Sequence, residues 1–292
     1  MVITKLIGGI GNQMFQYAAG KALAEHHDVE LKLDTNDFQF YSNRRFSLGH
    51  FNINADIATN EEILKFIGKN KSKSLMILRE RLGRLLPLKR RKIYYEPHFH
   101  YDENFFSLPP HIYINGYWQS EKYFNNIKSI ILNDFSFREP LEGVNKEISE
   151  KILSSNSVSI HIRRGDYVTN KFTFFTHGVC GIEYYLNAIN YISNLVEEPH
   201  FFIFSDEPEW ASDNLITTFP VTFVNHNSGQ NDFEDMRLLS ICRHHIIANS
   251  SFSWWGAWLC KNEDKIVVAP KKWFNEYRAS TKDLYPVQWV TI

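Results

Sequence analysis

The sequence predicts an α/β protein made of two Rossmann-like halves, each built around a parallel sheet. Three observations support this fold class. The chain opens as strand, turn, alanine-rich helix and second strand, and from about residue 145 onward apolar strand-like runs alternate with helical segments without interruption. Such alternation requires parallel strands covered by helices on both faces. Pro140 and Gly143 interrupt the pattern, so we expect domains at 1–140 and 141–292.

The first half begins with a strand, a helix and a strand. Val2 to Ile7 is predicted to be a buried strand, a glycine-rich turn occupies 8–13, and good helix formers extend from Phe15 to His27. A second strand is expected from Val29 to Leu33. No periodicity is clear over 35–57, and residues 60–67 are predicted to form a short helix that Asn60 caps.

The second half alternates between strands and helices throughout. We expect strands at Ser157–Ile162, Phe201–Ser205, Val221–Val224, His245–Ala248 and Ile266–Ala269. Helices are expected to end at Leu153, to span Ile182–Val196, Glu207–Leu215 and Phe233–Cys242, and to start near Ser253. In such a sheet the turns that follow the strands meet at one edge, where ligands bind.

Composition argues against several classes of protein. Of the 292 residues, 43% are hydrophobic and 22% are charged, as in soluble globular proteins. The 32 basic and 33 acidic side chains nearly cancel, which gives no general electrostatic reason to bind nucleic acid. Three cysteines without CxxC or Cys/His spacing indicate neither a disulfide scaffold nor a metal site. No run suits a signal sequence or a membrane span, so we expect a cytoplasmic protein.

A basic segment from Lys69 to Lys92 interleaves lysines and arginines with leucines at helical spacing. One interpretation is a surface helix with a solvated charged face. The other is peripheral membrane association, which would bring the protein to a lipid-linked substrate. Nothing in the sequence indicates an oligomeric state.

The most informative turn follows the strand that ends at Ile162. Arg163 and Arg164 come directly after it, and Asp166 follows two residues later. A guanidinium presents a planar fork of donors that matches phosphate oxygens and keeps its charge near neutral pH. We therefore expect the two arginines to bind a phosphorylated ligand; the alternative is a structural ion network with Asp166 and other acids.

The turn after the first strand carries Gly11, Asn12 and Gln13. Glycines allow close backbone approach to a ligand, and the two amides suit sugar hydroxyls. The turn is similar to a dinucleotide fingerprint, but Met14 stands where the third glycine is required. We therefore expect a sugar-binding turn rather than a nicotinamide or flavin site.

Two later turns also carry polar side chains. Ser205 and Asp206 end a strand, and the carboxylate of Asp206 either caps the next helix or accepts paired N–H donors from a guanine edge. In the other turn, three serines precede a helix, although a cap needs only one. Together with Phe252 they form the run Ser250, Ser251, Phe252 and Ser253, whose hydroxyl and N–H groups predict an anion pocket.

Together these strings resemble the α-1,2-fucosyltransferase family nearly end to end. The resemblance is carried by Gly8–Ala18, His161–Val168, Phe204–Asp206 and Ser250–Gly256. It implies a GT-B-like fold, in which two Rossmann-like domains with parallel sheets flank a central cleft. The resemblance also implies an acceptor-binding first domain, a GDP-fucose-binding second domain, and inverting transfer of L-fucose from GDP-β-L-fucose to the 2-hydroxyl of a galactose-terminated glycan. No metal or other cofactor is implied.

The resemblance also implies roles for single residues. Arg163 would hold the β-phosphate with Arg164 beside it, Asp166 would support the arginine or the acceptor, Asp206 with Ser205 would read guanine, and residues 250–253 would bind phosphate. Related α-1,6 enzymes place an acid five positions after the motif aspartate, where this chain has Lys171. Asp166 and His161 therefore remain the candidate bases. Another fucosyl linkage and a non-catalytic GDP-sugar- or glycan-binding protein are the alternatives.

Overall fold

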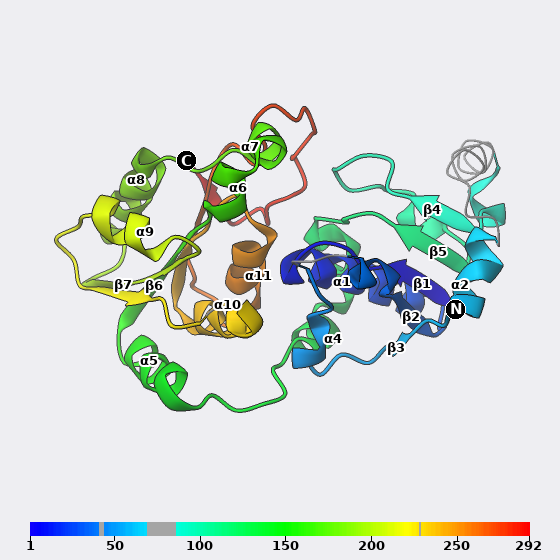
Figure 1. The fold of residues 1–292 in the computed structure, drawn as a ribbon, viewed down its shortest axis with the longest axis horizontal. Helices are drawn as coiled ribbons and strands as arrows, with labels where there is room; N and C mark the ends of the chain where they lie inside the picture. The colour runs from blue at the N-terminus through cyan, green and yellow to red at the C-terminus, as the bar shows by residue number, and fades with distance from the viewer. Residues whose placement is uncertain (41–43, 69–85, 228) are drawn as a thin grey trace. The chain divides into compact units, whose positions relative to one another are not determined.

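The computed structural model describes residues 1–40, 44–68, 86–227 and 229–292. The chain folds into two compact units, each with its own parallel sheet (Figure 1). Unit 1 comprises Met1–Ser136 and Ser280–Tyr285, and unit 2 comprises Phe137–Ala279 and Pro286–Ile292. The division therefore falls at 136/137 rather than at 140/141. Residues 280–285, expected in the second domain, pack with unit 1 instead.

Unit 1 is built around a five-stranded parallel sheet in the order β3-β2-β1-β5-β4. Its strands are β1 (Val2–Lys5), β2 (Leu31–Asp34), β3 (Asp56–Ile57), β4 (Ile93–Tyr95) and β5 (Ile112–Asn115). Its helices are α1 (Ile10–His26), α2 (Asn60–Ile67) and α4 (Lys128–Asp134). Short 3-10 helices lie at Asn36–Gln39, Leu48–His50, Leu88–Arg90, Phe105–Ser107, Glu121–Tyr123 and Asn125–Ile127.

Two helix starts in unit 1 differ from the sequence prediction. Helix α1 begins at Ile10, because Gly9 has the extended backbone of an N-cap and the helix follows it directly. Helix α2 is capped by Thr59, whose hydroxyl accepts from the Glu62 N–H while the Glu62 carboxylate accepts from the Thr59 N–H. This reciprocal capping box satisfies two donors that would otherwise be unpaired, so Asn60 is the first helical residue rather than the cap.

Unit 2 contains a six-stranded parallel sheet in the order β11-β10-β9-β6-β7-β8. Its strands are β6 (Asn156–Ile162), β7 (Pro199–Ser205), β8 (Val221–Val224), β9 (His244–Ile246), β10 (Val267–Ala269) and β11 (Val290–Thr291). Its helices are α5 (Gly143–Leu153), α6 (Gly165–Thr169), α7 (Lys171–His177), α8 (Ile182–Ser193), α9 (Pro208–Asn214), α10 (Asp232–Ile241) and α11 (Ser251–Leu259), with a 3-10 turn at Gly229–Asn231.

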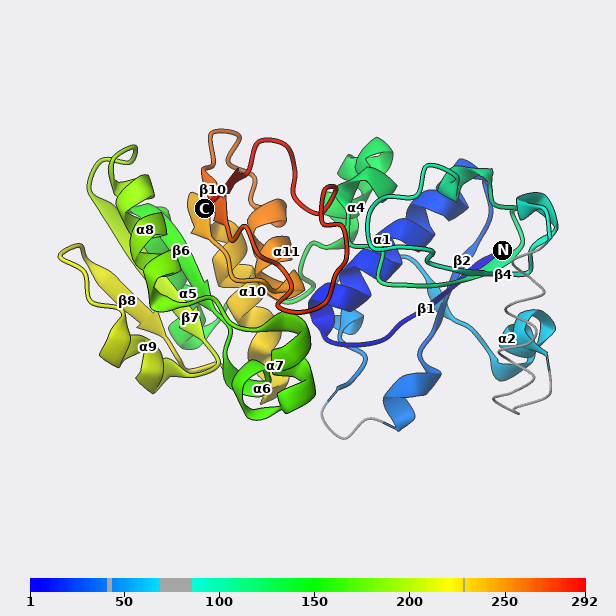
Figure 2. The ribbon, with the colours of Figure 1, turned by 90° about the horizontal axis from the view of Figure 1, so that it is seen from above.

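Alternate side chains of the unit 2 strands enter two separate cores. Ile203 packs with residues of α8 and α9 on one face, whereas Phe202 and Phe204 pack with α5 and α10 on the other. Figure 1 shows α8 and α9 on the face opposite α5 and α10, and Figure 2 gives the same unit seen from above. A strand buried on both faces explains the continuous apolar run Phe201–Phe204.

Two expectations concern membranes. Most of the predicted basic segment falls on residues 69–85, which lie outside the described residues. Among the helices of the described ranges, none combines the length and the apolar character needed to cross a membrane.

Candidate functional site

The polar turns of unit 2 meet where the strand order reverses. Strand β6 is flanked by β7 on one side and by β9 on the other, so the chain winds outward in both directions from the β6/β9 pair. In open α/β sheets this reversal leaves a crevice at the carboxyl ends of the strands, and ligands bind there. Arg163 follows β6 and Ser250 follows β9, so the structure brings two sequence-predicted motifs to this reversal.

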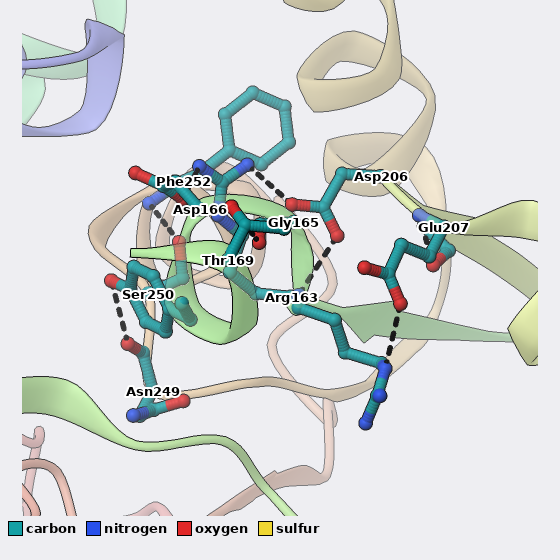
Figure 3. A network of polar contacts seen from close by, with 12 residues as sticks. Arg163, Gly165, Asp166, Thr169, Asp206, Glu207, Asn249, Ser250 and Phe252 are labelled. Atoms are coloured by element: carbon teal, nitrogen blue, oxygen red, sulfur yellow. Dashed lines mark hydrogen bonds and ion pairs between the residues drawn. The ribbon is translucent and has the colours of Figure 1, made fainter. Parts of the chain in front are cut away.

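Arg163 is held between two carboxylates (Figure 3). Its Nη2 lies 2.5 Å from Asp166 Oδ1, and its Nη1 lies 2.8 Å from Asp206 Oδ2. The guanidinium carbon also lies 5.5 Å from the ring centroid of Tyr167. Burial disfavours the charged form, but Asp206 and Asp166 outweigh it and raise the pKa of Arg163. These pairs occupy two of the five N–H donors, and the others remain suited to a ligand anion.

Asp206 links the ends of β6 and β7. Besides pairing with Arg163, it accepts a 2.8 Å hydrogen bond from the Arg164 N–H through Oδ1. Gly165 makes this approach possible, because a Cβ at that position would lie 2.7 Å from Asp206 Oδ2. The glycine of the motif therefore leaves room for the Asp206 carboxylate. This contact joins residues 41 positions apart, and the sequence did not predict it.

Arg164 does not join Arg163. Its Nε donates to Glu207 Oε2 at 2.9 Å, and its guanidinium carbon lies 3.9 Å from the ring centroid of Trp210 in α9. Ser205 serves the same turn, since its hydroxyl accepts from the Glu207 N–H at 3.0 Å. Both residues therefore organise the turn after β7, and the expected pair of arginines is replaced by one arginine at the reversal and one beside α9.

The residues of the serine run have different surroundings at the start of α11. Ser250 is the N-cap of α11, and its hydroxyl accepts from the Phe252 N–H at 3.3 Å. Ser253 is buried and donates to the carbonyls of Ala248 and Ser250 at 3.4 and 3.2 Å. Ser251 and Phe252 are half-buried in the first turn. The N–H groups of that turn carry the positive end of the helix dipole, so this end favours an anion.

His161 lies on β6 beneath this turn, with its ring 5.2 Å from that of Phe252. Burial, reinforced by the charge of Arg163, lowers its pKa to about 3. Its Nδ1 is buried and has no hydrogen-bond partner among the residues that the structure describes. The imidazole is therefore neutral at neutral pH and a weak base.

Asn249 and His177 belong to the surroundings of the site, and the sequence analysis gave neither a role. The Asn249 amide donates to the carbonyls of His177 and Trp273 at 2.9 and 3.2 Å, which fixes the segment after α7. The His177 ring stacks on Tyr167 at 4.9 Å between centroids. Tyr167 could have been found in the sequence, since it lies in the arginine motif, whereas His177 joins only through the path of α6 and α7.

The three residues predicted to bind a ligand at the glycine-rich turn of unit 1 have different surroundings. Gln13 is fully buried: its Nε2 donates to the carbonyls of Gly8 and Arg45 at 3.0 and 2.8 Å, and its Oε1 accepts from the Ser47 N–H at 2.9 Å. The Gln13 side chain therefore anchors the backbone of Gly8, Arg45 and Ser47. Gly11 is buried in α1, and only Asn12 remains half-exposed. Its Oδ1 accepts from Gln119 Nε2 at 2.8 Å.

Within the described ranges, no group of three or more His, Cys, Asp and Glu side chains has a geometry suited to a metal ion. The three cysteines are buried free thiols. Positive charge at the unit 2 site is supplied by Arg163 and by the first turn of α11.

Known proteins similar to this chain are glycosyltransferases. An alpha-1,2-colitosyltransferase of Escherichia coli is 35% identical over 308 residues, which cover 100% of this chain and 99% of the relative. The O-antigen biosynthesis glycosyltransferase WbnK of Escherichia coli is 36% identical over 92% of this chain and 93% of its own. Human galactoside alpha-(1,2)-fucosyltransferase 1 is 26% identical over 51% of this chain and 43% of its own.

Two solved structures with a similar fold are fucosyltransferases. NodZ from Bradyrhizobium matches with a TM-score of 0.53 and 14% identity over 87% of this chain and 91% of NodZ. NodZ alpha-1,6-fucosyltransferase soaked with GDP-fucose matches with a TM-score of 0.52 and 15% identity over 88% of this chain and 91% of its own. At this identity the likeness concerns the fold, and it confirms the predicted GT-B-like α/β class. The family model for glycosyl transferase family 11 matches residues 1–292, so the chain belongs to that family of glycosyltransferases.

Proposed function

We propose that the protein transfers L-fucose from GDP-β-L-fucose to the 2-hydroxyl of a terminal galactose, with inversion, to give an α-1,2-fucoside. The observation that carries this proposal is Arg163, held by two carboxylates at the strand-order reversal of unit 2 beside the N-terminus of α11. Membership of glycosyl transferase family 11 and relatives whose names specify α-1,2 transfer support the reaction and the linkage.

The chemistry of the leaving group explains this arrangement. When GDP departs from the anomeric carbon, negative charge accumulates on the diphosphate while the sugar becomes oxocarbenium-like. The remaining N–H donors of Arg163 and the first turn of α11 would stabilise that charge. Asp166 and Asp206 keep the guanidinium in place, so little reorganisation accompanies the reaction. We propose that these fixed charges take the part that a divalent metal plays in other transferases.

Two further roles remain proposals. Each oxygen of Asp206 accepts one N–H in this structure, but a carboxylate oxygen has two lone pairs, so Asp206 can still receive a guanine edge. For the acceptor proton we favour Asp166, whose side chain is 37% exposed, over His161, which is buried with a pKa of about 3.

One observation favours a second donor. The relative that matches this chain along its whole length is named for colitose rather than fucose. A colitose donor with the same nucleoside diphosphate would place the same charge beside Arg163 and α11, so these groups do not distinguish the two sugars. We therefore keep α-1,2 transfer of colitose as the second candidate.

The test is product analysis. The full-length protein is incubated with lactose and either GDP-fucose or GDP-activated colitose, with and without a chelator, and the linkage is determined by NMR. We expect an α-1,2 product from GDP-fucose, with turnover unchanged by the chelator. A different linkage would refute the regiochemistry, and binding of the donor without any product would support a binding protein. Loss of turnover that manganese restores would refute the metal-free mechanism.

A further inference from the structure

Unit 1 has its own reversal of strand order, between β1 and β5. The turn after β1 leads into α1, which carries Asn12, and the turn after β5 carries Gln119. These two side chains meet: Gln119 Nε2 donates to Asn12 Oδ1 at 2.8 Å. One amide pair therefore bridges the two turns at the place in this sheet where α/β proteins bind ligands.

The hydrogen bond between the two amides determines which of their polar atoms remain available to a ligand. Because Asn12 Oδ1 is occupied, Asn12 offers its Nδ2 as a donor. Gln119 is 7% exposed, and its Oε1 is buried without a partner among the described residues. A buried carbonyl oxygen that has lost water and gained no donor destabilises the fold. A hydroxyl group matches the pair, since it can donate to one amide and accept from the other.

The turn that carries Gln119 is fixed in an unusual conformation. Trp118 has a φ of 55°, in the left-handed region that favours glycine. Glu96, directly after β4, accepts from the N–H groups of Tyr117 and Trp118 at 2.7 and 3.0 Å. Gly116 allows this contact, because a Cβ there would lie 2.4 Å from Glu96 Cβ. Strained, well-anchored backbone of this kind concentrates at functional sites.

The residue before Gln119 in the sequence holds a second unsatisfied group. The indole Nε1 of Trp118 is also buried without a partner within the described part of the chain. Consecutive residues thus hold one unused donor and one unused acceptor, and neither group is charged. A neutral polyhydroxyl compound such as a sugar fits this chemistry better than a phosphate, which would require a cation.

We propose that Gln119 determines acceptor recognition: a hydroxyl of the galactose acceptor donates to Gln119 Oε1 and accepts from Asn12 Nδ2. This inference rests on the proposed function. It makes Gln119 a specificity-determining residue for the acceptor that the first domain is expected to bind.

The test separates acceptor affinity from donor affinity. Gln119→Glu keeps the size of the side chain but replaces the Nε2 donor by a second acceptor oxygen. Asn12 must then turn its Nδ2 toward the carboxylate and no longer offers it to the acceptor hydroxyl. Gln119→Ala removes both Oε1 and Nε2. We expect either variant to raise the KM for lactose by about tenfold or more, with the Kd for GDP unchanged within about twofold. Asn36→Ala is the matched control, since it removes an exposed 3.0 Å amide–amide bond to Asn60 elsewhere in unit 1 and should leave the KM for lactose unchanged. Thermal unfolding checks that each variant is folded. If Gln119→Ala does not fold, the isosteric Gln119→Glu alone decides the outcome.

The outcomes distinguish this inference from the proposed function. If the wild type transfers fucose and Gln119→Glu has a normal KM for lactose, the inference is overturned while the proposed function stands. If the wild type transfers no sugar, the proposed function fails, and ligand-observed NMR with lactose then decides the inference. Lactose signals that persist in the wild type and disappear in Gln119→Glu support it. Equal signals, or none with the wild type, overturn it.

Discussion

At the scale of single residues, the proposed donor site depends on charges that are held by other charges. Arg163 is one-quarter exposed and paired with two carboxylates, whereas Arg164, its neighbour in sequence, is committed to Glu207 and Trp210. The adjacent arginines thus make different contacts because the side chains of successive residues point in different directions. The sequence pointed to this pair of arginines but could not predict that their guanidiniums separate.

His161 yields a prediction about pH. Its pKa is about 3 in the folded protein, mainly through burial, and roughly 6.5 in an unfolded chain. The unfolded state therefore takes the proton first as pH falls. The contribution of His161 to stability is complete above about pH 6.5 and declines below it, approaching about 1.4 kcal/mol per pH unit until near pH 3.

The measurement is urea unfolding of the wild type and His161→Gln between pH 8 and pH 5. The difference at pH 8, where both side chains are neutral, gives the packing cost alone. We expect the stability of the wild type to fall more steeply than that of the variant below pH 6.5. Parallel curves over the whole range would show that His161 is not buried as a neutral ring.

At the scale of elements, the site is made by turns that a parallel sheet brings together. Arg163, Asp206 and Ser250, which follow β6, β7 and β9, are 43 to 87 positions apart in sequence, yet they share one edge of the sheet because the strands pair in register. The short helix α6 then returns Asp166 to Arg163.

Gly165 provides the prediction at this scale. Gly165→Ala places a Cβ 2.7 Å from Asp206 Oδ2 and should displace that carboxylate from Arg163. A helical alanine gains about 1 kcal/mol over glycine, whereas a lost charge-assisted bond costs about 1.5–3 kcal/mol. We expect a net loss of roughly 1 kcal/mol in calorimetry, with a clear fall in kcat/KM. Gly181→Ala, where a Cβ meets nothing within 4 Å, should leave kcat/KM unchanged; equal kcat/KM values in the two variants would refute the role of Gly165.

The sequence predicted long, periodic elements well and short ones poorly. From α5 to β10, all strands and the longer helices were expected near their observed positions, because each carries a continuous apolar run or a helical stripe. The short helices α6 and α7 in the same stretch were missed. Strands β4 and β5 were missed, since each has only three or four residues and neither is followed directly by an α-helix that would mark a strand–helix repeat. Gln13 was predicted to face a ligand, but its amide satisfies backbone groups of Arg45 and Ser47, which lie over 30 residues away.

At the scale of the whole molecule, each unit repeats one plan: a parallel sheet with a reversal of strand order and polar turns at the reversal. The division between the units is not a single point in the sequence. Residues 280–285 return to unit 1, where Asp283 pairs with Lys122 at 2.6 Å and accepts from the Tyr101 N–H at 3.1 Å. No local signal marks this return, because long-range contacts alone define it.

The central claim is that Arg163 binds the diphosphate of the donor, and titration calorimetry of GDP tests it most directly. Loss of a charge-assisted hydrogen bond of about 1.5–3 kcal/mol predicts that Arg163→Ala weakens GDP binding about 10- to 150-fold. Arg163→Lys should bind nearly as weakly, because a single ammonium cannot reproduce the planar fork. GDP affinity equal to that of the wild type in a folded Arg163→Ala protein would contradict the account.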